Sequence, residues 1–380
     1  MSNFLQQTFQ KTTIYNFDMR NNAFDFLRLF LASIVVIHHA CLAYNFTFIA
    51  RIQAGGEGGG VDIGGFALYG FFLISGFLIT ASWVNSNNFG SFILKRVKRI
   101  YPGFWTALLI SAFVVLPICA IAKGLNFFRY EYIRNIIWYI QRNFDGEMRS
   151  EFIYNLVNKN DVIHINLSAW TIILEIRSYL AIAIVGFFGL FNKRYLFLIL
   201  LALSSVNFFF MSYNDLVDWN FLTGDKIQLN TLLATLFGSS RFFIFYHYTI
   251  IGIVAFLYKD KIIWNYGIFS ICCLVLAISF WTNTAGIFMP ITYSYIILFL
   301  SQALPVKNLA KKIGDWSYGT YLYGWGVYLI MFSYGLNFIL PFPVYALINL
   351  IGALICGYLS YNLVEKHFLG KSKRIINTIQ

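Results

Sequence analysis

Apolar residues dominate long runs of this chain, and polar residues gather in the short segments between the runs. Each run is close to the roughly 20 residues that a helix needs to cross the hydrocarbon core of a bilayer. Helices satisfy their backbone groups internally, which lipid requires of any spanning segment. The pattern therefore predicts an all-α, polytopic membrane bundle of about ten transmembrane helices, at residues 24–44, 64–84, 101–122, 165–189, 195–213, 236–258, 262–281, 287–305, 316–337 and 344–364.

The basic residues between these runs predict the orientation of the bundle. Cytoplasmic loops of membrane proteins carry an excess of Lys and Arg. With the N-terminus inside, the basic clusters at 95–99 and 366–374 also lie inside, and the short outer loops hold only Arg51, Lys226 and Arg241. We therefore expect both termini to be cytoplasmic, with one long outer segment at about 123–163.

This organisation divides the chain into three parts. We expect a cytoplasmic N-terminal segment at 1–23, a membrane domain at 24–365 and a short cytoplasmic tail at 366–380. Because the tail is short, the chemistry is expected to come from the membrane body and its loops.

Composition agrees with a membrane location and narrows the choice of partners. Only 12% of the residues are charged, and the mean hydropathy is +0.66, whereas soluble domains carry about 25% charged residues. Cytoplasmic loops account for the net charge of +12. No zinc finger or RNA-binding signature accompanies that charge, so we expect no nucleic-acid partner. The five cysteines lack C-x-x-C spacing, which gives no indication of a metal site.

The first apolar run contains ionisable residues that a bilayer normally excludes: Arg28, His38 and His39. A charge near the bilayer centre costs at least about 2.5–3.5 kcal/mol, which marks such residues as candidate functional groups. At about 100° per residue, Arg28 and His39 return to within about 20° of one helix face, roughly 16 Å apart along the axis. Asp25 falls near that face, whereas His38 points about 100° away. The alternative is that Arg28 snorkels to the interface and that the histidines satisfy neighbouring helices.

A second polar group lies in LSAWTIILEIRSYL, residues 167–180. Glu175 and Tyr179 are four residues apart and should share a helix face. Arg177 lies about 200° round the helix from Glu175 and is expected to face another partner. The depths of Glu175 and His39 are compatible with an acid–histidine pair, which the sequence leaves open.

Six segments, in order along the chain, carry a family resemblance. They are RLFLASIVVIHH (28–39), FFLISGFLI (71–79), FILKRVKRIYPGFW (92–105), LSAWTIILEIRSYL (167–180), IGDWSYGTYLYGW (313–325) and VEKHF (364–368). Together they resemble the motifs of the membrane acyltransferase-3 family. The chain departs from the family pattern at Gly324, where many members have a histidine before the tryptophan.

The resemblance implies an enzyme that transfers an acyl group, usually acetyl, from cytoplasmic acyl-CoA to a hydroxyl. The implied acceptor is a cell-surface glycan or its lipid-linked precursor. Many members of the family modify bacterial surface polysaccharides, so we expect a multi-pass protein of the bacterial inner membrane. Acetyl-CoA or another acyl-CoA is then the donor substrate, with no permanently bound cofactor.

The resemblance also suggests roles for individual residues. His39 is expected to act as general base, or as an acyl relay, with Glu175 as its partner. Ser75 and Tyr179 are expected to line the site. Arg28 is expected to hold the CoA phosphates or the thioester carbonyl. Arg96 and Arg99 are candidates for the nucleotide phosphates, and simple anchoring at the cytoplasmic face is the alternative for both.

Two other functions remain open from the sequence. A transporter of a glycan or a proton-coupled solute would also place Arg, His and Glu in the membrane, but the chain shows no internal repeat of the kind many transporters have. A non-catalytic scaffold would explain the hydrophobicity but not the buried charges. Acyl-CoA consumption distinguishes the enzyme from both.

Two segments outside the runs are also interpreted from their composition. GGEGGG, residues 55–60, lacks the Lys-Ser/Thr ending of a phosphate loop, so we expect a flexible outer loop. The segment at 123–163 is rich in Tyr, Trp, Asn and Arg. It is suited to binding a sugar, or it forms a cap without substrate contact.

Overall fold

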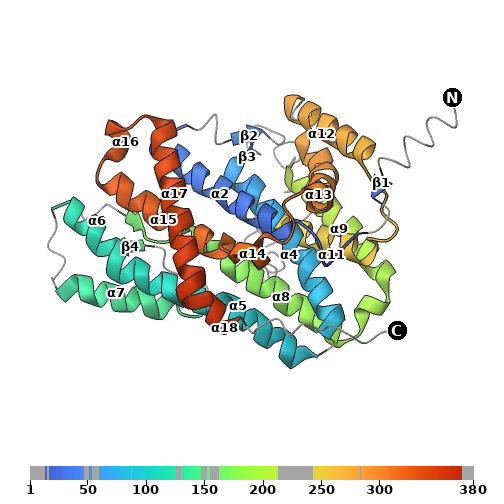
Figure 1. Ribbon diagram of the computed structural model, residues 1–380, viewed down its shortest axis with the longest axis horizontal. Helices are drawn as coiled ribbons and strands as arrows, with labels where there is room; N and C mark the ends of the chain where they lie inside the picture. The colour runs from blue at the N-terminus through green and yellow to red at the C-terminus, as the bar shows by residue number, and fades with distance from the viewer. Residues whose placement is uncertain are drawn as a thin grey trace, which may run out of the picture.

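The structure is a computed structural model, and it describes residues 13–14, 17–46, 51–53, 60–86, 88–124, 130–146, 152–154, 162–212, 243–282 and 284–369. The bundle is essentially all-α (Figure 1). Its helices are α2 (Phe24–Ala43), α4 (Ile63–Ser86), α5 (Phe89–Ile110), α6 (Leu116–Ala122), α7 (Tyr130–Asn143), α8 (Ile172–Phe187), α9 (Arg194–Ser212), α11 (Phe243–Leu257), α12 (Tyr266–Trp281), α13 (Ala285–Ala303), α14 (Leu309–Ile313), α15 (Ser317–Ser333), α16 (Leu336–Ile339), α17 (Phe342–Ser360) and α18 (Lys366–Phe368).

Short strands pair only as isolated antiparallel ribbons among the described residues. β1 (Thr13–Ile14) pairs with β6 (Trp264–Asn265), β2 (Arg51–Gln53) with β3 (Gly60–Asp62), and β4 (Phe152–Tyr154) with β5 (Val162–His164). The first of these pairs ties the N-terminal segment to the start of α12. Most of the Gly-rich segment predicted as an outer loop, residues 55–59, lies outside the described residues.

Each apolar run of the sequence corresponds to a helix of the structure. Six helical stretches within the described residues are long and apolar enough to cross a membrane, namely Phe24–Ala43, Ile63–Ser86, Phe89–Ala122, Leu167–Phe187, Ala285–Ala303 and Phe342–Phe368. Shorter apolar helices occupy Arg194–Val206, Phe243–Leu257 and Tyr266–Trp281. The prediction of an all-α membrane bundle is confirmed, while the count of ten spans and the orientation of the termini stay predictions.

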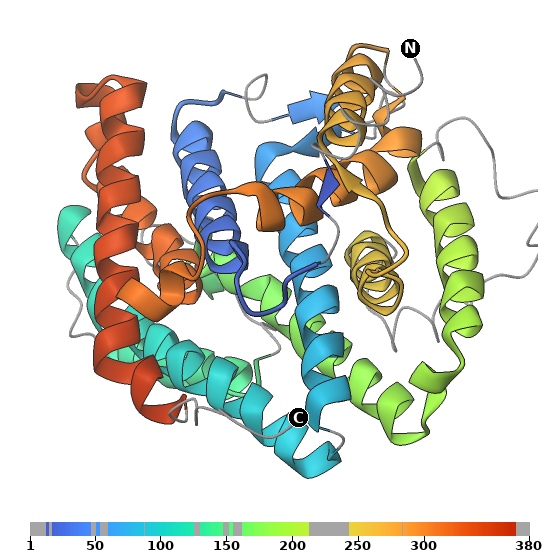
Figure 2. The ribbon, with the colours of Figure 1, turned by 45° about the vertical axis from the view of Figure 1, so that its right-hand side comes forward.

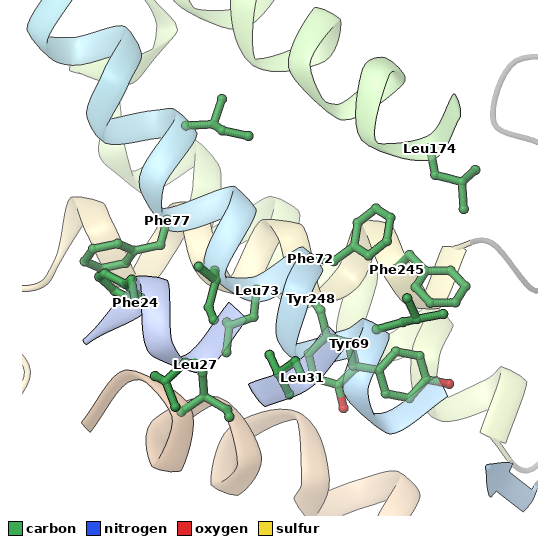
Figure 3. Close-up of a cluster of buried hydrophobic side chains, with 14 of the residues drawn as sticks. Phe24, Leu27, Leu31, Tyr69, Phe72, Leu73, Phe77, Leu174, Phe245 and Tyr248 are labelled. Atoms are coloured by element: carbon green, nitrogen blue, oxygen red, sulfur yellow. The ribbon is translucent and has the colours of Figure 1, made fainter. Parts of the chain in front are cut away.

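Helix α2 lies at the centre of the bundle. It packs on one side against α4 and on the other against α15 and α17 (Figure 2). Figure 3 shows Phe24, Leu27 and Leu31 of α2 beside Leu73 and Phe77 of α4. The inward-facing side chains of α2 therefore join the two halves of the core, which explains why its few polar groups come close to several other helices.

Helices α4 and α11 approach each other backbone to backbone. A Cβ atom added at Gly76 would collide with the backbone carbonyl of Thr249, and one at Gly252 would collide with the carbonyl of Leu73. Small residues permit such close helix contacts in membrane proteins, where packing rather than the hydrophobic effect drives association. Gly76 and Gly252 thus set the spacing between these two helices.

Part of the long segment after α6 folds back against the preceding helices. The end of α7 lies against the second half of α5, where the Trp105 indole donates to the Phe144 carbonyl at 2.9 Å and the Tyr101 hydroxyl donates to the Asp145 carbonyl at 3.1 Å. Helix α7 therefore runs back along the continuous α5–α6 stretch. Helix α7 packs against that stretch, and nothing in the described parts of residues 123–163 tests whether the segment binds sugar.

We predict that Gly76→Ala lowers the stability of the folded protein by about 1–3 kcal/mol, because overpacking forces the two backbones apart. The change should appear as a lower midpoint of thermal unfolding in detergent. Gly90→Ala is the matched control, since the atom nearest an added Cβ there is 3.7 Å away. Equal midpoints for wild type and Gly76→Ala would show that the helices are free to separate.

Candidate active site

Three of the predicted site residues, from three different helices, line one small cavity. Arg28 of α2, Ser75 of α4 and Glu175 of α8 all face this cavity, whose volume is about 40 Å³. The remaining lining residues are apolar or hydroxyl-bearing: Leu68, Phe71, Phe72, Thr171, Ile172, Ser317, Tyr318 and Tyr321. The space is sufficient for water or a small substrate group, which would lie close to these polar side chains.

Glu175 is held by the residue that its helical spacing predicts. The hydroxyl of Tyr179, one turn further along α8, donates to Oε1 of Glu175. The guanidinium of Arg96 lies 5.7 Å from the centre of the Tyr179 ring, and it also donates to the Ser82 hydroxyl at 3.3 Å. Tyr179 therefore connects the acid of the cavity with an arginine of α5, and Arg96 has no carboxylate partner among the described residues.

A carboxylate that the sequence interpretation did not select organises the other two arginines. Asp315, just before α15, lies 2.6 Å from Arg99 and 3.5 Å from Arg28. The Ser317 hydroxyl donates to the same carboxylate at 2.5 Å. Burial by itself would raise the pKa of Asp315, but the guanidinium groups of Arg99 and Arg28 hold this pKa well below its usual range.

Glu365 is a second acid that the sequence interpretation passed over. Its side chain is only 1% exposed, and it accepts a hydrogen bond from the Ser360 hydroxyl at 2.8 Å. The carboxylate of Glu365 also interacts electrostatically with the guanidinium of Arg99. Both Asp315 and Glu365 belong to motif segments of the sequence, IGDWSYG and VEKHF. An acid within a motif beside an apolar run is the signal that would have identified them.

His39 occupies a different environment from Glu175. It is 6% exposed, and its ring lies 4.9 Å from that of Trp325, edge to face, and 6.4 Å from that of Tyr328. Nδ1 of His39 is buried with no hydrogen-bond partner among the described residues. His39 does not line the cavity of Arg28 and Glu175, so its predicted pairing with Glu175 has no supporting contact here and stays a prediction.

Comparison with known proteins identifies the family of the chain. The family model described as an acyltransferase domain (Acyl_transf_3) matches residues 21–362, nearly the whole chain. The chain belongs to the acyltransferase-3 family. An O-acetyl transferase of Shigella phage Sf6 is 26% identical to this acyltransferase-3 protein over 366 residues, which are 93% of this chain and 97% of the relative. No solved structure matches the chain. The resemblance drawn from the six motifs is therefore confirmed.

In this acyltransferase-3 protein, we predict that Asp315→Asn is destabilising, by about 3 kcal/mol, because two partly buried guanidinium groups lose their counter-ion. Asp260→Asn is the control, since Asp260 is 74% exposed beside Lys259 and such pairs contribute little. Thermal unfolding of the purified variants in detergent measures both effects.

The same ion pairs predict that the folded protein loses stability as the pH falls below about 4. The folded-state pKa of Asp315 lies below its unfolded value of about 3.9. The ionised Asp315 therefore adds to the free energy of unfolding above about pH 4. This stabilisation is lost as the pH falls towards the folded-state pKa. Asp315→Asn should show a smaller loss of stability than wild type between about pH 5 and pH 3. Parallel profiles would show that Asp315 contributes no charge-dependent stability.

Proposed function

We propose that this protein is an integral membrane O-acetyltransferase. It moves an acetyl or other short acyl group from cytoplasmic acyl-CoA to a hydroxyl of a cell-surface glycan or its lipid-linked precursor. The observation that carries the proposal is the family match over residues 21–362, within which Arg28, Ser75 and Glu175 converge on one cavity. The similarity to a phage O-acetyl transferase over nearly the full length supports acetyl as the transferred group.

The proposed donor site lies at the arginine cluster of α2 and α5. Guanidinium groups bind phosphate through paired, charge-assisted hydrogen bonds. Arg28 and Arg99 already share Asp315, whereas the described contacts of Arg96 are one hydroxyl and two aromatic rings. Arg96 therefore has the most bonding capacity left for a CoA phosphate. Arg28 and Arg99 shape the site and place positive charge beside it.

The proposed reaction centre lies further along α2, at His39. Arg28 and His39 share one face of α2, roughly 16 Å apart along its axis. A CoA whose nucleotide binds at the arginines would extend its pantetheine arm along this face towards His39. His39 then removes the proton of the attacking hydroxyl, or takes the acyl group itself and passes it on. Glu175 and Tyr179 contribute polar groups near the arginine end.

The proposed topology follows from this arrangement. Ten spans with both termini in the cytoplasm put Arg28, Arg96 and Arg99 near the side where acyl-CoA is made, in the inner membrane of a bacterium. The acyl group then passes along α2 towards the opposite side of the membrane. The grouping of the three arginines, with α2 and α5 beginning at the same end of the bundle, supports this direction (Figure 1).

The first test measures acetyl-CoA hydrolysis and acetyl transfer by the purified protein in nanodiscs, for wild type, His39→Ala and His38→Ala. We expect His39→Ala to lose at least about 100-fold in kcat, because general-base catalysis contributes roughly 10²–10⁴-fold. His38→Ala should retain activity. Similar rates for all three proteins would remove His39 from the mechanism, and no acyl-CoA turnover by wild type would favour transport.

The donor site is tested separately with Arg96→Ala and the neighbouring control Lys98→Ala, whose side chain is exposed. Loss of a charge-assisted hydrogen bond predicts a KM for acetyl-CoA that rises roughly tenfold or more in Arg96→Ala alone. The midpoint of thermal unfolding monitors folding of both variants. An equal KM for the two variants would contradict a phosphate-binding role for Arg96.

A further inference from the structure

A second and larger cavity lies on the far side of α8 from Glu175. Helices α8, α9 and α11 enclose about 570 Å³, in the size range of small-molecule sites. Figure 2 shows α9 standing at the edge of the bundle with α11 between it and α4. The proposed transfer reaction uses no residue of this cavity, so the cavity needs an explanation of its own.

The cavity is polar at one end and apolar at the other. Arg194 of α9 donates to the Leu257 carbonyl of α11 at 3.2 Å, which places the start of α9 beside the end of α11. The apolar end therefore holds Ile184, Phe197 and Ile253. The opposite end holds the polar lining residues Arg177, Ser204, Tyr246 and His247, together with Phe208, whose ring stacks on that of His247. Such a gradient matches a molecule with one hydrocarbon chain and a polar head.

His247 presents an unused hydrogen-bond acceptor at the polar end. Its side chain is 2% exposed, and its Nδ1 lies 2.9 Å from the Ser204 hydroxyl oxygen. The same hydroxyl donates to the Leu201 carbonyl at 3.0 Å. In the tautomer that keeps this bond, Nδ1 carries the ring hydrogen and donates to Ser204. Nε2 then carries a lone pair, and it is buried with no partner among the described residues.

An unsatisfied buried acceptor costs about 1–3 kcal/mol and calls for a donor. A phosphate or carboxylate oxygen cannot donate, so the lone pair of Nε2 disfavours an anionic head. Arg177, the cation at this end, interacts with the Tyr246 hydroxyl, and its other N–H groups can donate to a hydroxyl oxygen. The complementary group is therefore a neutral hydroxyl. Glu175 and Arg177 are two positions apart on α8 and line different cavities, so α8 separates the small ionic cavity from this one.

We propose that this cavity binds a long-chain alcohol from the membrane, whose hydroxyl donates to Nε2 of His247. Its hydrocarbon chain lies between α8 and α9, towards Ile184 and Phe197. The bilayer is as apolar as the cavity wall, so burial of the chain contributes little to selectivity. The hydrogen bond to His247 decides which lipid binds. This site is independent of the proposed acetyl transfer.

The test uses two photoreactive probes: a 16-carbon primary alcohol with a diazirine near its far end, and the methyl ether of the same molecule. Each is added to the full-length protein in nanodiscs, and labelled peptides are quantified by mass spectrometry. In wild type we expect the alcohol to label α8, α9 and α11 roughly fivefold or more above the ether, because only the alcohol donates a hydrogen bond.

Three test variants and one control variant sharpen the outcome. His247→Phe should remove the preference for the alcohol, and His247→Gln, whose amide oxygen accepts near the position of Nε2, should keep part of it. Ala181→Trp, on the cavity wall, should block labelling, and His367→Phe, in α18, is the control with unchanged labelling. Equal labelling of wild type by alcohol and ether, or labelling spread evenly over the lipid-facing helices, would overturn the proposal. The wild-type comparison decides the question even if a variant fails to fold.

Discussion

The carboxylate of Asp315, held between Arg28 and Arg99, is the interaction on which the arrangement of this bundle depends. It joins α2, α5 and the start of α15, which are far apart in sequence. Charges inside an apolar bundle are tolerated only when they are paired. Because Arg28 and Arg99 share this counter-ion, the first turns of α2, the middle of α5 and the start of α15 must meet. The small cavity between Arg28, Ser75 and Glu175 lies beside that meeting point.

Neighbouring residues on two helices divide the interior into separate environments. Ser75 faces the ionic cavity, while Gly76, the next residue, lets α4 touch the backbone of α11. On α8, Glu175 faces the same cavity and Arg177 faces the larger apolar one. The two helices thus keep the polar chemistry of the arginine cluster apart from the lipid-like space behind it. A substrate at one cavity and a lipid at the other would contact opposite faces of α8.

The relation between Arg28 and His39 gives the proposed reaction its direction. Both lie on one face of α2, with the arginine in the ionic cluster and the histidine packed against Trp325 and Tyr328. A donor with a charged nucleotide and a long flexible arm fits this separation of charge and reactive group. The acyltransferase-3 match over residues 21–362 includes both residues.

The sequence by itself determined the helices and the residues that share a face, because hydrophobic runs and the 3.6-residue period are local properties. Glu175 bonds Tyr179 one turn away, and Arg177 faces elsewhere, as their spacing predicts. Only the tertiary structure decided that Asp315 pairs with Arg28 and Arg99, that Glu175 shares a cavity with Arg28 and Ser75, and that His247 borders a second cavity. These contacts join residues of different helices, and helical periodicity carries no information about which helices become neighbours.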